Sequence, residues 1–291
     1  MKKRAKSLIV VLACLLAGSV GFNIYLLFFS MQSYLQDPDE IYTMEAGILR
    51  NNLGLRQVED VTLIYDFHHE NYTQLIETYE IDKIAGEGSE FVRAMRLMDE
   101  FAPRLHHDSW YDNHIEMNAL ALLEYSLDHQ NQGINCRNKA QILNEMCLAL
   151  GIYARKVWIM PNSGYDNDCH VVNEVWDSTL DKWVMLDITN NQYWVDGDGI
   201  PLSVLEIRTK GAMREFCTPV TVGENLRDLE KLKQRHISKF LYIMKNMTYM
   251  QYCDVYTVGE SETIYLLFPE NLDTSYELFI SEKTVTESPI Q

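Results

Sequence analysis

Hydrophobic and polar positions separate one long apolar run near the N-terminus from a body of shorter, periodic segments. Leu8–Phe29 is a largely apolar run with one side-chain amide, that of Asn23, and a helix of that length can span the roughly 30 Å hydrocarbon core of a bilayer. Four basic residues precede the run, which predicts a cytoplasmic N-terminus and an extracellular body. We therefore expect residues 1–30 to form a single-pass membrane anchor.

Two alternatives remain open for this segment. Ala17-Gly18-Ser19 offers small residues where a signal peptide could be cleaved, which would release a secreted protein. Cys14 could instead carry a lipid, although the bulky Leu12 is unusual at its position before such a cysteine.

The body divides into a polar tether over residues 31–60, a main domain over 61–215 and an α/β extension over 216–291 that packs on the core. Periodicity predicts helices over residues 73–84, 90–101, 113–127 and 226–239. Runs rich in β-branched and aromatic residues predict strands over residues 154–160, 170–176, 183–187, 240–257, 263–268 and 276–280.

One helix of the main domain begins at a cysteine. Asn135 is a good N-cap for it, and Gly151 suits a left-handed C-terminal cap. Cys136 then falls in the first turn, at the positive end of the helix dipole. Such a position lowers a thiol pKa and favours the nucleophilic thiolate.

Two strands after this helix carry a histidine and an aspartate. His170 opens one strand and Asp187 closes the next, and a hairpin brings the start of one strand near the end of its neighbour. The aspartate can then orient the imidazole. A helix-start cysteine that faces such a histidine has the layout for thiol acyl transfer.

The stretches GINC, LALGIYARKVW, CHVVNEVW and DKWVMLDIT resemble the transglutaminase-like superfamily, over about residues 113–208. The resemblance implies a papain-like α+β fold, of a bacterial membrane-anchored type, in which a cysteine-bearing helix packs on an antiparallel sheet. It maps the nucleophile onto Cys136, the base onto His170 and the orienting acid onto Asp187. Many members have Asp-Pro-Thr after the third strand, whereas this chain has Asp187, Ile188 and Thr189, a change that removes no catalytic group.

Further residues are candidates for the oxyanion hole or the cleft. Trp110, Asn113 and Gln132 precede the nucleophile and could add a donor to the Cys136 backbone N–H. Glu174 and Trp176 lie on the same strand face as His170, although ordinary strand packing explains Trp176 equally well.

Charge limits the partners of the body. The whole chain has a net charge of −17, and the body alone has 21 basic and 42 acidic residues because residues 1–30 contain four basic and no acidic ones. This balance argues against nucleic acid or anionic lipid as a partner. We expect a peptide or protein substrate, membrane contact through residues 8–29 only, and no cofactor.

The remaining cysteines admit several roles. Five of six lie outside the apolar run, and export would permit a Cys169–Cys217 or a Cys217–Cys253 disulfide. Cys147 falls on the apolar helix face, and Cys169 should point away from His170 on the opposite strand face. The chain has no CxxC or HExxH pattern, so we expect no metal site.

Three functional hypotheses follow. The first is cysteine-dependent acyl transfer on peptide or carboxamide bonds, which ends in hydrolysis or in amine cross-linking. The second is a catalytically silent binding or scaffold module tethered to the membrane. A third and weaker one gives Cys169 a redox role with another thiol.

Overall fold

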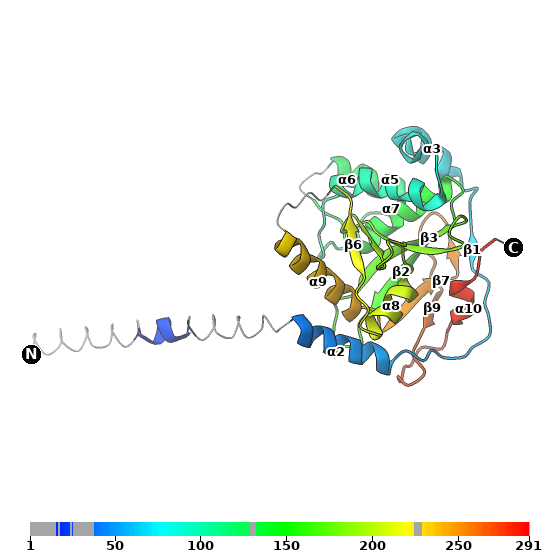
Figure 1. The fold of residues 1–291 in the computed structure, drawn as a ribbon. Helices are drawn as coiled ribbons and strands as arrows, with labels where there is room; N and C mark the ends of the chain where they lie inside the picture. Colours follow the sequence, from blue (N-terminus) through cyan, green and yellow to red (C-terminus); the bar gives the residue numbers. More distant parts are fainter. Residues whose placement is uncertain are drawn as a thin grey trace, which may run out of the picture. The chain divides into compact units, whose positions relative to one another are not determined.

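A computed structural model of the chain describes residues 16, 18–23, 25, 38–128, 132–223 and 229–290, which form two units, Met1–Thr43 and Met44–Gln291 (Figure 1). The described residues between 16 and 25 are helical. No helix within these ranges is both long and apolar enough to span a bilayer. Most of the anchor predicted over residues 1–30 lies outside the described part of the chain, as do residues 31–37 of the tether.

The helices that precede the main sheet are α2 (Pro38–Asn51), α3 (Glu70–Tyr79), α4 (Ile81–Ala85), α5 (Glu90–Phe101), α6 (Ala119–Asp128) and α7 (Cys136–Ala149). The helix predicted over 90–101 matches α5. The helix predicted over 73–84 is broken at Glu80, whose backbone is left-handed with φ of 50°. The helix predicted over 113–127 begins only at Ala119, as α6, and Asn113 has a left-handed backbone with φ of 57°.

Seven antiparallel strands form the main sheet in the order β6-β5-β4-β3-β2-β7-β9, which confirms the predicted α+β class. They are β2 (Ala154–Met160), β3 (His170–Asp177), β4 (Lys182–Asp187), β5 (Gln192–Val195), β6 (Thr218–Thr221), β7 (Tyr249–Cys253) and β9 (Ile264–Leu267). A separate parallel pair joins β1 (Ile64–Tyr65) to β8 (Val255–Tyr256). In Figure 1, α5, α6 and α7 lie on one side of the sheet, with α8 (Val204–Ala212) and α10 (Glu282–Thr286) on the other.

Residues after 215 extend this sheet at both of its edges. β7 and β9 extend it beyond β2, and β6 extends it beyond β5. The stretch predicted as strand from Phe240 is helical up to Lys245, because α9 runs over Leu229–Lys245. Residues 276–280 form only an isolated bridge, between Phe279 and Leu266.

Helix α7 is fixed at both ends and against the sheet. Asn135 caps it through a reciprocal capping box with Asn138, and Gly151 follows it with φ of 73°. The buried Asn173 of β3 donates a 2.9 Å hydrogen bond from Nδ2 to the carbonyl of Ala140. These local signals and one buried contact set the position of the helix start relative to β3.

The opposite side of the sheet contains a buried ion pair. Arg155 Nη2 lies 2.6 Å from Glu174 Oε2, and both side chains are at most 2% exposed. Glu174 also accepts the Val204 N–H at 2.9 Å, and Arg155 donates to the Val285 carbonyl at 2.6 Å. The pair therefore joins the sheet to α8 and α10.

We expect Arg155→Leu to lower the free energy of unfolding by about 3–5 kcal/mol, because Glu174 would be left buried without its counter-charge. Lys182→Ala is the matched control, since the Lys182–Glu206 pair is partly exposed and should contribute at most about 1 kcal/mol. Urea denaturation followed by tryptophan fluorescence measures both. Equal losses in the two variants would contradict this role for the buried pair.

Candidate active site

The first turn of α7 lies against a neighbouring segment because of a glycine. Gly133 has backbone atoms of His107 and Asp108 within 2.8 Å of where its Cβ would be, so no side chain fits there. The close approach lets Ile134 exchange backbone hydrogen bonds of 3.1 Å with His106 and Asp108. Cys136 consequently begins the helix next to the segment that contains His107.

His170 and Asp187 meet at the start of β3 and the end of β4. His170 Nε2 lies 3.0 Å from Asp187 Oδ2, and the two side chains are 4% and 0% exposed. The distance is that of an ion pair, although the ring N–H does not point directly along the line to the oxygen. Since Nε2 faces the carboxylate, Nδ1 is the ring nitrogen left for Cys136, with which the imidazole makes a side-chain hydrogen bond.

The Asp187 carboxylate is held by the turn that follows it. Its Oδ1 accepts the N–H groups of Thr189 at 3.1 Å and Asn190 at 3.2 Å. Its Oδ2 accepts the side-chain amides of Asn190 at 2.7 Å and Gln192 at 3.3 Å. A fully buried carboxylate with these donors is fixed in place and in its charged form.

The three groups shift one another's protonation. Burial by itself raises the pKa of the Cys136 thiol, but the hydrogen bond and charge of His170 outweigh it, and the pKa lies below its ordinary value of 9.0. Burial also works against the His170 imidazolium, yet Asp187 and Cys136 raise its pKa from 6.5 to about 10. The pKa of Asp187 is lowered despite its burial, chiefly by the charge of His170. The site therefore favours a thiolate–imidazolium pair.

A pocket of about 610 Å³ opens beside Cys136 and His170. Its walls come from the loop before β3, the turn after β4 and helix α9. In α9, the Tyr242 ring centroid lies 5.7 Å from that of His170, and Lys245 pairs with Asp166 at 2.9 Å and Asp168 at 3.0 Å. The pocket has the size of a ligand site and exposes a half-buried thiol.

Residues 78–188 match the model of the Transglutaminase-like superfamily. The segment contains the cysteine-bearing helix and the strands that carry His170 and Asp187, and the antiparallel sheet with its helices is consistent with a transglutaminase core. The sequence resemblance to this superfamily is thereby supported for the transglutaminase-like domain. Helix α9 and strands β5, β6, β7 and β9 lie outside the matched segment.

A crystal structure from Cytophaga hutchinsonii, described as that of a candidate cysteine protease, aligns with 76% of this chain at 14% identity and a TM-score of 0.32. This chain spans about 60% of the length of that protein. No curated protein matches the chain.

The structure does not bring the other candidates into the pocket of the transglutaminase-like domain. Trp110 is 93% exposed and directly follows Ser109, which lines the pocket. Gln132 is also exposed, and its side-chain oxygen accepts a 2.6 Å hydrogen bond from the Tyr125 hydroxyl. Glu174 shares a strand face with His170 but lies four residues further along. Because a strand rises about 3.3 Å per residue, the two residues are roughly 13 Å apart. It is committed to the ion pair with Arg155. Asn113 instead accepts from Asn135 and Asn138, at 3.1 and 3.2 Å, and supports the helix start.

Three pocket residues carried little sequence signal. His107 lines the pocket, and burial lowers its pKa. Cys169, expected to point away from the site, also lines it. Tyr242 is about 70 residues from His170 along the chain, so no local pattern connects them. Gly133 was the one available hint for His107, because a glycine before a capped helix often marks a close backbone approach.

The five cysteines within the described ranges are free, so neither Cys169–Cys217 nor Cys217–Cys253 is a disulfide in this structure. Cys147 is fully buried in the main core, as its place on the apolar helix face predicted. Within the part of the chain that the structure describes, no group of three His, Cys, Asp or Glu side chains could hold a metal ion.

We expect Asp187→Asn to move the pH midpoint of Cys136 alkylation upward. The loss of the carboxylate charge lowers the pKa of His170, which then no longer holds a thiolate at neutral pH. Removal of Asp187 also relieves a direct repulsion of the thiolate, but this effect on the Cys136 pKa is smaller than that of His170. Wild-type protein should have its midpoint below 9.0.

The measurement is the iodoacetamide reaction rate against pH, with the site quantified by mass spectrometry. Cys169 is the internal control, since burial raises its pKa and it should react only at higher pH. An unchanged Cys136 midpoint in the Asn variant would show that Asp187 does not set the charge of the pair.

Proposed function

We propose that this protein catalyses cysteine-dependent acyl transfer on peptide or carboxamide bonds through Cys136, His170 and Asp187. The observation that carries the proposal is the buried His170, held at 3.0 Å by Asp187 and hydrogen-bonded to a thiol at a helix start, beside an open pocket. The match of residues 78–188 to the Transglutaminase-like superfamily supports the same reaction class.

The chemistry proceeds in two halves. The Cys136 thiolate attacks the carbonyl carbon and forms a tetrahedral oxyanion. His170 then gives its proton to the leaving nitrogen, the C–N bond breaks, and a thioester remains on Cys136. Water or a second amine attacks the thioester, His170 takes the proton of that nucleophile, and the thiolate leaves. The two acceptors give hydrolysis and cross-linking respectively.

The backbone at the start of α7 is suited to the oxyanion. Asn135 satisfies the N–H of Asn138 with its side chain and that of Lys139 with its carbonyl. The first helical N–H groups, of Cys136 and Arg137, have no partner inside the helix. The Cys136 N–H can therefore donate to an oxygen on the carbon that its own thiolate attacks, with help from the helix dipole.

The alternative is a silent module that has kept the fold and lost turnover. The silent module and the enzyme differ in the expected reactivity of the Cys136 thiol. A scaffold needs no thiolate, so Cys136 would react with iodoacetamide no faster than the buried Cys253, whose pKa is raised by burial. The lowered pKa of Cys136 favours the enzyme.

We expect Cys136→Ala to abolish turnover of peptide-amide substrates, because the other thiol that lines the pocket, Cys169, has a pKa raised by burial and is not the thiol that His170 hydrogen-bonds. Cys169→Ala is the matched control, as it removes a thiol that lines the same pocket but keeps the triad. Substrates come from a peptide-amide library, and mass spectrometry identifies the acyl group trapped on Cys136 of the wild-type protein. Equal turnover by wild-type protein and Cys136→Ala would refute the proposal.

We also propose that residues 8–29 anchor the protein in the cell membrane with the body outside, on the strength of the apolar run and its basic flank. The chain should stay with membranes after an alkaline carbonate wash, and an impermeant amine reagent should label the body in intact cells. An N-terminus found by mass spectrometry to begin near Ser19 would instead indicate signal cleavage and secretion.

A further inference from the structure

The His170 imidazole is almost sealed from solvent although it lines an open pocket. Its side chain is only 4% exposed. Asp187 and Cys136 contact its two ring nitrogens, and both nitrogens lie on the edge of the ring. A ring that is held at two edge atoms can still tilt about the line that joins them. The tilt of the imidazole, and the access of water to it, must therefore be set by a third group.

The Tyr242 ring of helix α9 packs against this imidazole. The two ring centroids are 5.7 Å apart and the ring planes meet at 67°, which is the edge-to-face arrangement that aromatic pairs favour. Tyr242 is half-buried and lines the same pocket, so its ring limits how much of His170 the pocket exposes. Burial raises the pKa of Tyr242 above its ordinary value of 10.0. The phenol therefore stays neutral and adds no negative charge beside the thiolate.

The buried face of α9 determines where Tyr242 points. The Phe240 ring centroid lies 5.7 Å from that of Trp194 in β5. Met244 packs on Gly211 of α8 so closely that a Cβ on the glycine would lie 3.1 Å from Met244 Cγ. Phe240 and Met244 are at most 1% exposed and lie one turn apart, on one face of the helix. Tyr242 is midway between them along the chain, so it leaves the helix on the opposite side, toward the pocket.

The loop that leads into β3 is fastened to the same part of α9. The Tyr242 hydroxyl donates a long hydrogen bond of 3.4 Å to Asp168 Oδ1. Lys245, almost one turn further along α9, pairs with Asp168 at 3.0 Å and with Asp166 at 2.9 Å. Because Asp168 is two residues before His170, α9 fixes both this loop and the ring beside the imidazole. The ion pairs of Lys245 remain if the hydroxyl is removed, so the ring should then keep its place.

We propose that Tyr242 is a positioning residue, whose ring holds the His170 imidazole in line between Asp187 and Cys136 and shields its contact with Asp187 from water. The inference rests on the proposed function and adds to it a residue outside the segment that matches the superfamily. A tilted imidazole delivers its proton to the leaving nitrogen less often, because proton transfer needs a donor within hydrogen-bond reach. The ring therefore acts on the rate of acyl transfer more than on substrate binding.

The first measurement follows the His170 ring proton that faces Asp187, by NMR of the full chain with isotope-labelled histidine. Burial works against the imidazolium, but Asp187 and Cys136 raise the pKa of His170 to about 10, so the ring keeps this proton at neutral pH. A charge-assisted N–H bond gives a far-downfield signal when exchange with water is slow, and His170→Gln identifies the signal by its loss. Tyr242→Ala should speed this exchange about tenfold or more, whereas Tyr242→Phe should keep the wild-type rate.

The second measurement is the turnover of a peptide amide by the same variants. Tyr242→Ala should lower kcat about tenfold or more and change KM less than about threefold, because the base is misplaced while the thiol is kept. Tyr242→Phe should retain kcat within about threefold, since the ring remains. Tyr165→Ala is the matched control, because it removes a tyrosine that is 99% exposed, in the loop before β3 but outside the pocket lining. Tyr242→Leu tests the same point if the Ala variant does not fold.

The outcomes separate the two proposals. An exchange rate or a kcat of Tyr242→Ala within about threefold of the wild-type value overturns the positioning role, as does the absence of the downfield signal from wild-type protein. A Phe variant as impaired as the Ala variant also overturns it, because the hydroxyl and not the ring would then matter. Cys136 no more reactive toward iodoacetamide than Cys253 refutes acyl transfer, and the exchange rates then still decide whether Tyr242 shields His170.

Discussion

The contact between His170 and Asp187 is the interaction on which the candidate site depends. Two groups with almost no solvent exposure lie 3.0 Å apart, and either charge would be costly to bury alone. The turn after β4 and the first residue of β5 lower that cost with four donors to Asp187. The charge and the hydrogen bond of this imidazole lower the pKa of the half-buried Cys136 thiol.

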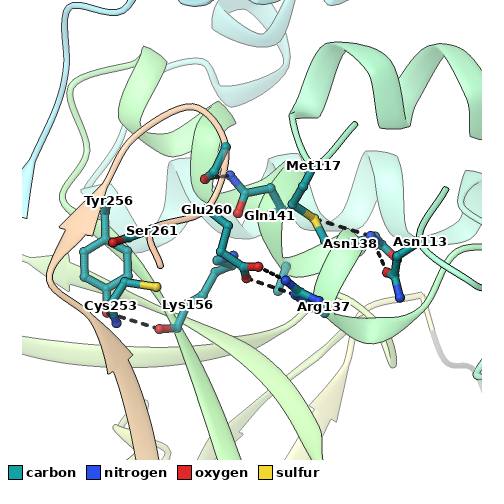
Figure 2. Close-up of polar contacts among 12 residues, drawn as sticks. Asn113, Met117, Arg137, Asn138, Gln141, Lys156, Cys253, Tyr256, Glu260 and Ser261 are labelled. Carbon is teal, nitrogen blue, oxygen red and sulfur yellow. Dashed lines mark hydrogen bonds and ion pairs between the residues drawn. The ribbon is translucent and has the colours of Figure 1, made fainter. Parts of the chain in front are cut away.

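The segment that matches the superfamily contains the triad but not all of its surroundings. Residues beyond 215 contribute both edges of the sheet and helix α9, which forms one wall of the catalytic pocket. A C-terminal loop also binds the outer side of α7: Gln141 donates to the Gly259 carbonyl at 2.7 Å, and the Gly259 N–H donates to Glu145 at 3.1 Å (Figure 2 shows Gln141 and Glu260 there). The three candidate catalytic residues therefore lie within the matched segment, whereas part of the pocket wall comes from residues outside it.

This division has a consequence for substrate choice. The three candidate catalytic residues come from the end of one helix and two adjacent strands, which the domain core fixes. The walls of the pocket beside Cys136 also come from elements outside the matched segment, among them helix α9. Under the proposed function, the same core would accept different substrates if those flanking elements changed.

The sequence by itself determined the features that depend on neighbouring residues. The cap at Asn135, the left-handed Gly151, helix α5 and the strands β2 to β4 follow from side-chain period and capping, which act within a few residues. It also placed Cys136, His170 and Asp187 at element ends, where a hairpin must bring the latter two together.

Tertiary structure decided which side chains meet across long separations. Trp110 and Gln132 precede the nucleophile and yet point elsewhere, and Glu174 is drawn into an ion pair whose partner, Arg155, is buried on the far side of the sheet from α7. Tyr242 reaches His170 only because α9 packs beside β6. Such contacts depend on sheet register and on the packing of distant elements, and no pattern within a short window of the chain encodes them.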